Sequence, residues 1–360
     1  MIFQIQKKIK QRHDDKSLRR KLAHKAFVHA RNKFQDGLSK AVIKEINDRK
    51  QNFWDYKRIK APSNFSLINN PDEVLQFISK LNEAYNKHKK VFVVLYNVVE
   101  MTNDAIVLLL SNVAQFKAAH IDFNGDKPRN PYIAKQIEDS GFYRILYQRF
   151  RKDDDTIDLS NKSIYTHAQK NVDSELTAKI ISNNSEFLWN EPRRCQGVQR
   201  IFIELMQNTN NHASHTVGDK YWWMSVSRRT NPNTLCFSFI DYGMGIFKSL
   251  SSKKSTDKFY GWMEKIKQII NPEKHHEVLA SMLSGEFHRT VTNQYFRGKG
   301  LPGIYKALEQ RAITKLIVIS NDAYANPTDN HYYGLNFGLD GTFVYFELDE
   351  TCKNCKEQIY

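Results

Sequence analysis

The chain has 360 residues, of which 41% are hydrophobic and 26% charged, and it carries a net charge of +15 at neutral pH. This length exceeds one typical domain, and the hydrophobic share excludes a wholly disordered chain, so we expect two or three globular domains. The apolar runs are about half as long as a membrane-spanning helix requires, and MIFQIQKKIKQR lacks the apolar segment of a secretory signal. We therefore expect no membrane contact and a cytoplasmic protein.

The basic charge is concentrated at the N-terminus. Residues 1–60 hold 18 Lys and Arg against 6 Asp and Glu, which accounts for +12 of the total. Apolar residues at helical spacing over 17–50 predict one or two basic amphipathic helices. Such a segment either neutralises the phosphates of a nucleic acid, attracts an acidic protein surface, or is a solvated helical face. Residues 51–71, rich in Asn, Ser and Pro, are expected to connect it to the next unit.

Residues 61–155 alternate between helical and strand patterns, which predicts a small α/β domain. The expected order is a helix over 72–88, a strand over 91–96, a helix over 104–118 and a strand near 120–123. A last helix follows Asn130, a plausible N-cap, with Pro131 at its first position and Gly141 at its end.

This segment resembles a STAS domain, the α/β fold of anti-sigma-factor antagonists. The resemblance depends on the strand VFVVLYNVVEM, which leads through a turn into a helix. In those antagonists a serine of that turn accepts phosphate, whereas this chain has Thr102, Asn103, Asp104 and Ala105. Asn103 stands at the acceptor position and cannot be phosphorylated. The resemblance therefore implies a docking or scaffolding domain that contacts a protein partner, with Thr102 either a substitute acceptor or a helix cap.

A third unit is expected over 156–350, after the polar linker 151–165 and before a tail over 351–360. Its first motif is RIFIELMQNTNNHAS, in which an apolar stripe has helical periodicity. Glu204, Asn208 and His212 recur at every fourth position beside that stripe, so one helix face carries a carboxylate, an amide and an imidazole.

Three glycine-containing motifs follow. In CFSFIDYGMGI, a strand leads to Asp241, and Gly243 and Gly245 permit close approach of a ligand to the backbone. RGKGLPGIYKAL places glycines before a helix, where free backbone N–H groups suit phosphate. GLDGTFVYFELD places Thr342 before a final strand.

The order of these motifs resembles the N, G1, G2 and G3 boxes of GHKL ATPases, over residues 170–350. The resemblance implies an α/β sandwich with a mixed sheet covered by helices, and ATP and Mg²⁺ as cofactors. It further implies that Asn208 binds Mg²⁺, that Glu204 activates water or an acceptor hydroxyl, and that Asp241 accepts the adenine amino group. Gly243 and Gly245 would shape the adenine pocket. The other implied nucleotide-binding residues lie near the phosphates or the base: His212, Arg297, Gly298, Lys299, Gly300, Leu301 and Thr342. Two residues depart from the family pattern, Pro302 and Asn211.

Residues 246–297 would form the lid over the nucleotide. Phe259 to Ile270 and the run HHEVLASML each have a helical pattern. A lid with this much structure is expected to contact a partner as well as the nucleotide.

Three functions remain open. The chain is a nucleotide-dependent switch that acts through partner contacts, a Ser/Thr protein kinase of the anti-sigma-factor type, or an ATPase that acts on nucleic acid through residues 1–60. A histidine kinase is disfavoured, because no phospho-accepting His lies in a helical hairpin before the ATPase motifs. A topoisomerase or repair ATPase is disfavoured because only ten residues follow Glu350.

Four cysteines in a chain of this length predict reduced thiols rather than a disulfide framework. Cys352 and Cys355 form a CxxC pair, which is half of a zinc site unless Cys195 and Cys236 or a second chain complete it.

Overall fold

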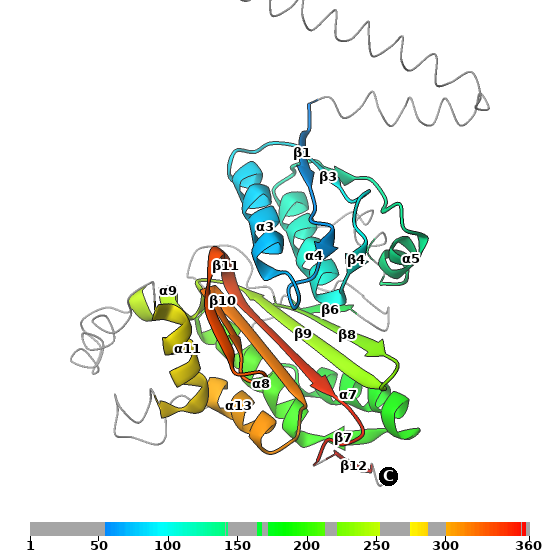
Figure 1. Cartoon of the computed structure of the whole chain (residues 1–360), viewed down its shortest axis with the longest axis vertical. Helices are drawn as coiled ribbons and strands as arrows, with labels where there is room; N and C mark the ends of the chain where they lie inside the picture. The colour runs from blue at the N-terminus through cyan, green and yellow to red at the C-terminus, as the bar shows by residue number, and fades with distance from the viewer. Residues whose placement is uncertain are drawn as a thin grey trace, which may run out of the picture. The chain divides into compact units, whose positions relative to one another are not determined.

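A computed structural model describes residues 55–140, 142, 164–167, 172–212, 222–252, 274–286, 300–353 and 355–357. The chain divides into two compact units, with the boundary between Tyr56 and Lys57. The predicted basic helices over 17–50, residues 151–163 of the second predicted linker and much of the predicted lid lie outside the described residues. The fold that follows is that of the second unit, which is a mixed α/β structure (Figure 1).

The first part of this unit, residues 57–142, is here named the N-terminal layer. It has a three-stranded parallel sheet in the order β1-β3-β5 and a short parallel pair, β2-β4. Its elements are β1 (Lys57–Lys60), β2 (Asn64–Phe65), α3 (Pro71–Asn86), β3 (Val91–Val94), β4 (Glu100–Met101), α4 (Asn103–Ala118), β5 (Phe123–Gly125) and α5 (Pro131–Asp139).

The helices of this layer agree with their sequence signals. α3 and α5 both begin with proline, which suits the first helical position because its missing N–H is not needed there. The Asn130 side chain accepts a hydrogen bond from the backbone N–H of Tyr132 at 2.9 Å, so the predicted N-cap is confirmed. The structure differs from the prediction at β1, which lies within residues 51–71, expected to be a connection without a strand. It pairs in parallel with β3, and such pairing depends on residues more than 30 positions away.

The second part contains a five-stranded sheet in the order β10-β11-β9-β8-β6. Its strands are β6 (Ile164–His167), β8 (Trp222–Arg229), β9 (Thr234–Tyr242), β10 (Lys315–Asn326) and β11 (His331–Leu348). The associated elements are α7 (Ser174–Trp189), β7 (Arg193–Cys195), α8 (Gln196–His212), α9 (Gly245–Ser252), α11 (His275–Ser284), α13 (Gly300–Glu309) and β12 (Cys355–Glu357).

The two faces of this sheet belong to different cores. Side chains of a strand alternate between faces, and in β9 Phe237 and Phe239 belong to one core while Ile240 belongs to the other. The first core contains α7, α8, α11 and α13, and we name that side the helix face. The stripe predicted on α8 is confirmed there, since Val198 and Phe202 are fully buried.

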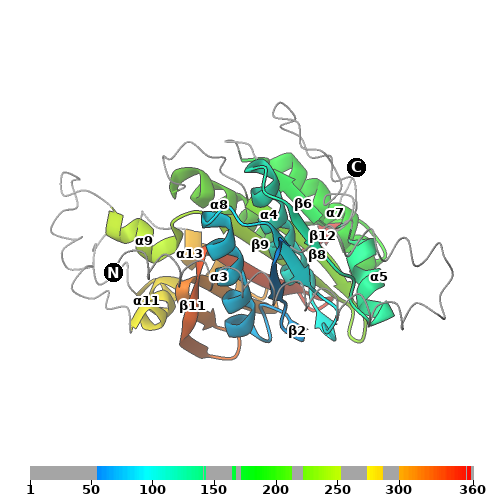
Figure 2. The ribbon, with the colours of Figure 1, turned by 90° about the horizontal axis from the view of Figure 1, so that it is seen from above.

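The opposite face is covered by the N-terminal layer. α4 packs on β8 and β9, and α3 packs on β11. α4 is buried along nearly its whole length because it lies between its own parallel sheet and the larger sheet. Figure 1 shows α3 and α4 on one side of the larger sheet and α8 and α13 on the other. Figure 2, seen from above, shows α3 and α4 lying over the strands of that sheet. The two parts therefore share one continuous apolar core.

Two expectations are wrong. All strand pairs described in the larger sheet are antiparallel, so it is not mixed. β8 with β9 and β10 with β11 are joined by short connections, and a short connection permits only antiparallel pairing. The cysteines are also not all reduced, because Cys195 and Cys355 form a disulfide between the paired strands β7 and β12. Cys236 and Cys352 are free thiols.

Among the residues that the structure describes, none of the helices has the length and apolar character needed to cross a membrane.

Candidate functional site

The candidate site begins at Asp241, near the end of β9. Its carboxylate accepts a hydrogen bond from the backbone N–H of Thr342 at 2.7 Å, and the Thr209 hydroxyl lies 3.5 Å from its second oxygen. Thr209 is on α8, so the carboxylate points to the helix face. Burial raises the pKa of Asp241 to about 6, against the lowering effect of the Thr342 hydrogen bond. A partly buried carboxylate with no cationic partner among the described residues can accept a hydrogen bond from a ligand.

α8 supplies the second part of the site. Its periodicity places Glu204, Asn208 and Thr209 along the side that borders the core. The Glu204 side chain is 18% exposed and lies 3.6 Å from the guanidinium of Arg200, one turn earlier. Asn208 is partly buried and Thr209 is buried. α8 therefore carries a carboxylate and an amide on the side that borders the core, and its Thr209 hydroxyl contacts Asp241.

The start of α13 approaches α8 closely. Gly300 is buried, and a Cβ at this position would lie 2.7 Å from the Nδ2 atom of Asn208. Only a glycine leaves this space open without displacing the amide. Leu301 is partly buried and packs against the helix-face core. Two predicted motifs about 90 positions apart in the chain are thus in contact.

β11 completes the site through backbone geometry. Thr342 pairs with Asp241, and Gly341 pairs with Tyr242. Gly341 has φ of +139°, and a Cβ there would lie 1.9 Å from the carbonyl oxygen of Asp241. No other residue fits this position without moving β9 or β11.

A polar group that the sequence analysis missed holds the turn after β9. Asn321 on β10 donates from Nδ2 to the carbonyl of Met244 at 2.9 Å and accepts from the N–H of Phe247 at 3.0 Å. Ser320 accepts from the N–H of Ile246 at 2.9 Å. These bonds fix the turn that contains Gly243 and Gly245 and the start of α9. The sequence contains no signal for them, because an Asn within a strand pattern has no local partner.

α11, from the predicted lid, is attached to the same strand. The His275 ring lies 2.5 Å from the carboxylate of Asp322 and stacks on Phe247 of α9 at a centroid distance of 4.1 Å. The helical prediction for HHEVLASML is confirmed by α11. The described parts of the predicted lid are therefore packed against β10, next to the turn after β9.

Several predicted site residues lie beyond what the structure describes. His212 is the last residue of α8, but its side chain is not described. Arg297, Gly298 and Lys299, and the helical pattern over 259–270, lie outside the described residues. Within the described parts of the chain there is no cluster of three or more His, Cys, Asp or Glu side chains suited to a metal ion. Mg²⁺ bound at Asn208 would need most of its ligands from phosphate and water.

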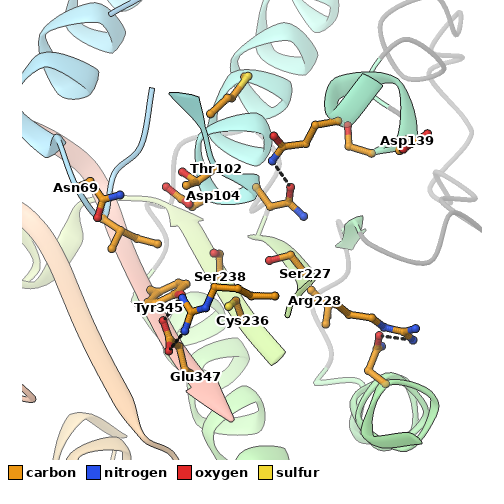
Figure 3. Close-up of a pocket in the computed structure, with 18 of the residues that line it drawn as sticks. Asn69, Thr102, Asp104, Asp139, Ser227, Arg228, Cys236, Ser238, Tyr345 and Glu347 are labelled. Carbon is orange, nitrogen blue, oxygen red and sulfur yellow. Dashed lines mark hydrogen bonds and ion pairs between the residues drawn. The ribbon is translucent and has the colours of Figure 1, made fainter. Parts of the chain in front are cut away.

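A cavity of about 940 Å³ lies on the other face of the sheet, between the N-terminal layer and the strands (Figure 3). Its roof includes Thr102 and Asp104 at the start of α4, and its floor includes Ser238 and Tyr345. Asp104 is 2% exposed, and burial raises its pKa to about 6, although its carboxylate accepts the backbone N–H of Leu67 at 2.8 Å. The turn at Thr102, whose sequence resembles the position of the STAS acceptor, thus lies on the side of the sheet opposite Asp241.

Comparisons of the chain with protein-family models, with curated proteins and with solved structures give no match.

Proposed function

We propose that the chain binds ATP with Mg²⁺ on the helix face of its antiparallel sheet, as a GHKL-type module, and acts as a nucleotide-dependent switch. The observation that carries the proposal is that the segments with the four motifs adjoin one another around Asp241 and Asn208. α8 and β11 both contact this partly buried carboxylate, β10 holds the turn that follows it, and the start of α13 contacts Asn208, the residue before Thr209 on α8. Motifs that met only by chance in the sequence would have no reason to be adjacent in the fold.

Each residue has a role that its position supports. Asp241 accepts the adenine amino group, since its carboxylate is partly buried and has no cationic partner among its described contacts. Asn208 supplies an amide oxygen to Mg²⁺, whose remaining ligands are phosphate and water oxygens. Glu204 lies one turn before Asn208 and orients a water molecule or an acceptor hydroxyl. The open space at Gly300 keeps the Asn208 amide free for this contact.

We assign the nucleotide-dependent switch to the predicted lid, residues 246–297. α9 and α11 are held against β10 by the contacts of Asn321 and Asp322, immediately beside the proposed adenine pocket. Nucleotide binding would change the balance between this packing and contacts with phosphate, and so alter the surface offered to a partner protein.

The kinase alternative is disfavoured for the chain's own N-terminal layer. The turn at Thr102 faces the cavity whose floor includes Ser238 and Tyr345, on the sheet face opposite Asp241. A phosphate on the helix face would have to pass through the sheet to reach that turn. Any phosphoryl transfer by this module would need an acceptor on another molecule.

Calorimetric titration of the full chain with ATP and Mg²⁺ tests the proposal. We expect saturable binding to one site and a loss of affinity of at least about tenfold in Asp241→Asn, because a hydrogen bond to a charged group contributes about 1.5–3 kcal/mol. Asp122→Asn, an exposed carboxylate of the N-terminal layer, is the matched control and should bind like the parent. Absence of binding in the parent, or equal affinity in Asp241→Asn, would reject the assignment.

A further inference from the structure

A hydrogen bond connects the proposed nucleotide site to the N-terminal layer. Tyr242, the residue after Asp241, points to the opposite face of the sheet and hydrogen-bonds to the hydroxyl of Ser111 on α4. These residues are 131 positions apart in the chain. Ser111 is 6% exposed, and the Tyr242 ring packs against the core shared by both layers.

The direction of this hydrogen bond follows from its neighbours. The Ser111 hydroxyl donates its proton to the carbonyl of Leu108 at 2.7 Å, so its lone pairs are left to accept. Tyr242 is therefore the donor. Burial raises the pKa of Tyr242 well above its usual range, which keeps the phenol protonated and able to donate.

Strand geometry links Tyr242 to Asp241. Consecutive residues of a strand point to opposite faces, so one residue faces α8 and the next faces α4. Tyr242 is also paired with Gly341, where the two backbones are too close for any side chain. A shift of the Tyr242 backbone must therefore shift Asp241 and the β11 residue Thr342 that hydrogen-bonds to it.

We propose that Tyr242 is a positioning residue that couples nucleotide binding at Asp241 to helix α4 of the N-terminal layer. The hydrogen bond to Ser111 holds the end of β9 in the position where the carboxylate meets adenine. In the reverse direction, nucleotide on Asp241 stabilises the end of β9 and, through Tyr242, the central part of α4. This coupling depends on the proposed nucleotide-binding function, and it makes the N-terminal layer a part of the switch.

Affinity measurements on three variants test the positioning role. Tyr242→Phe and Ser111→Ala each remove the hydrogen bond, and we expect each to weaken ATP binding about three- to tenfold. The double variant should be no weaker than either single variant, because the same bond is lost. Tyr345→Phe is the matched control. It removes a buried tyrosine hydroxyl from the same sheet face, but that hydroxyl donates to Glu347 of its own strand at 2.6 Å and makes no bond to α4.

Hydrogen exchange provides a readout that a merely structural role would not change. We expect ATP to slow amide exchange in α4 (Asn103–Ala118) of the parent and of Tyr345→Phe, and to have no such effect in Tyr242→Phe. If Tyr242→Phe does not fold, Ser111→Ala gives the same measurement.

The two proposals fail in different ways. A parent protein that does not bind ATP rejects the proposed function and this coupling with it. A parent that binds ATP, with α4 exchange unchanged and Tyr242→Phe binding normally, overturns the coupling and leaves the proposed function intact.

Discussion

At the residue scale, the candidate site depends on positions where a side chain is absent as much as on those where one is present. Gly300 makes room for the Asn208 amide, and Gly341 permits β11 to approach the backbone of Asp241. Both glycines bring together segments that are far apart in the chain. Substitutions at these positions should therefore change ligand binding through a neighbour, without any direct ligand contact.

We expect Gly300→Ala to weaken binding of ATP with Mg²⁺, because the new methyl group would overlap the Asn208 amide and turn it away from the metal position. Stability should change little, about 1 kcal/mol or less, since the displaced group is the end of a side chain and alanine favours a helix. Gly303→Ala is the control, because outside its own helix backbone no described residue lies within 4 Å of the added Cβ. Titrations with and without Mg²⁺ check this. Equal binding by the two variants would contradict a role for Asn208 at the metal.

Asp104 predicts a pH dependence of stability. Its pKa is raised from an ordinary value of 3.8 to about 6, chiefly by burial. Above about pH 6 the carboxylate is charged in both the folded and the unfolded state, and burying that charge destabilises the folded state. Below about pH 4 the group is protonated in both states, so this destabilisation disappears. Asp104→Asn should therefore be more stable than the parent near pH 7.5, by about 1–3 kcal/mol, and this advantage should vanish towards pH 4.

Urea denaturation of both proteins at several pH values measures this difference. The amide oxygen can still accept the Leu67 N–H, so the local hydrogen bond is kept. Asp139→Asn, an exposed carboxylate that lines the same cavity, is the control and should show no such pH-dependent gain. A gain that is the same at all pH values would show that charge burial is not its source.

At the scale of elements, the disulfide attaches the last described strand to the start of α8. Cys195 ends β7, α8 begins at the next residue, and Cys355 begins β12. The bond spans 160 positions of the chain. Cross-links that close long loops restrict the unfolded chain most strongly in the chain-entropy account.

Cys355→Ser should lower the free energy of unfolding by about 2–5 kcal/mol, and dithiothreitol should have a similar effect on the parent. Cys352→Ser is a close control, because this thiol is free and lies three residues away. Thermal unfolding followed by circular dichroism, with and without reductant, compares the three proteins. A loss in Cys352→Ser equal to that in Cys355→Ser would show that the disulfide is not the stabilising feature.

At the scale of the whole molecule, residues 1–56 and 57–360 are separate units, while the N-terminal layer and the antiparallel sheet share one core. Residues 1–56 hold 15 Lys and Arg against 6 Asp and Glu, which is +9 of the net charge of +15, in a unit that contains none of the proposed nucleotide residues. Its contribution should be separable by truncation at the structural boundary.

Deletion of residues 1–56 should leave stability and ATP binding unchanged and remove any association that depends on charge. Deletion of residues 1–60 is an informative comparison, because it also removes β1, which pairs with β3 in the N-terminal layer. The longer deletion should lower the melting temperature. Gel shift with DNA or RNA at increasing salt then tests the basic segment, since affinity that depends on phosphate contacts falls steeply with salt. If the full chain and the shorter deletion bind equally, the basic segment has no role in nucleic-acid binding.

The sequence by itself determined the local structure. The helices from α3 to α5, α8 and α11 follow from periodicity and capping signals within a few residues of each position. The order of motifs from Glu204 to Thr342 was also visible, because each motif is a short run. These features depend on neighbours in the chain, and a single sequence contains that information.

Only the tertiary structure decided how these pieces combine. Several features depend on residues that are far apart in the chain: the N-terminal layer that covers one face of the larger sheet, the pairing of β1 with β3, the all-antiparallel order of the larger sheet and the Cys195–Cys355 pair. Asp241 and Tyr242 are adjacent in sequence, yet they serve opposite faces, and their partners Thr342 and Ser111 are 101 and 131 positions away. Periodicity predicts that neighbouring strand residues diverge, but which core each one meets is set by packing between distant segments.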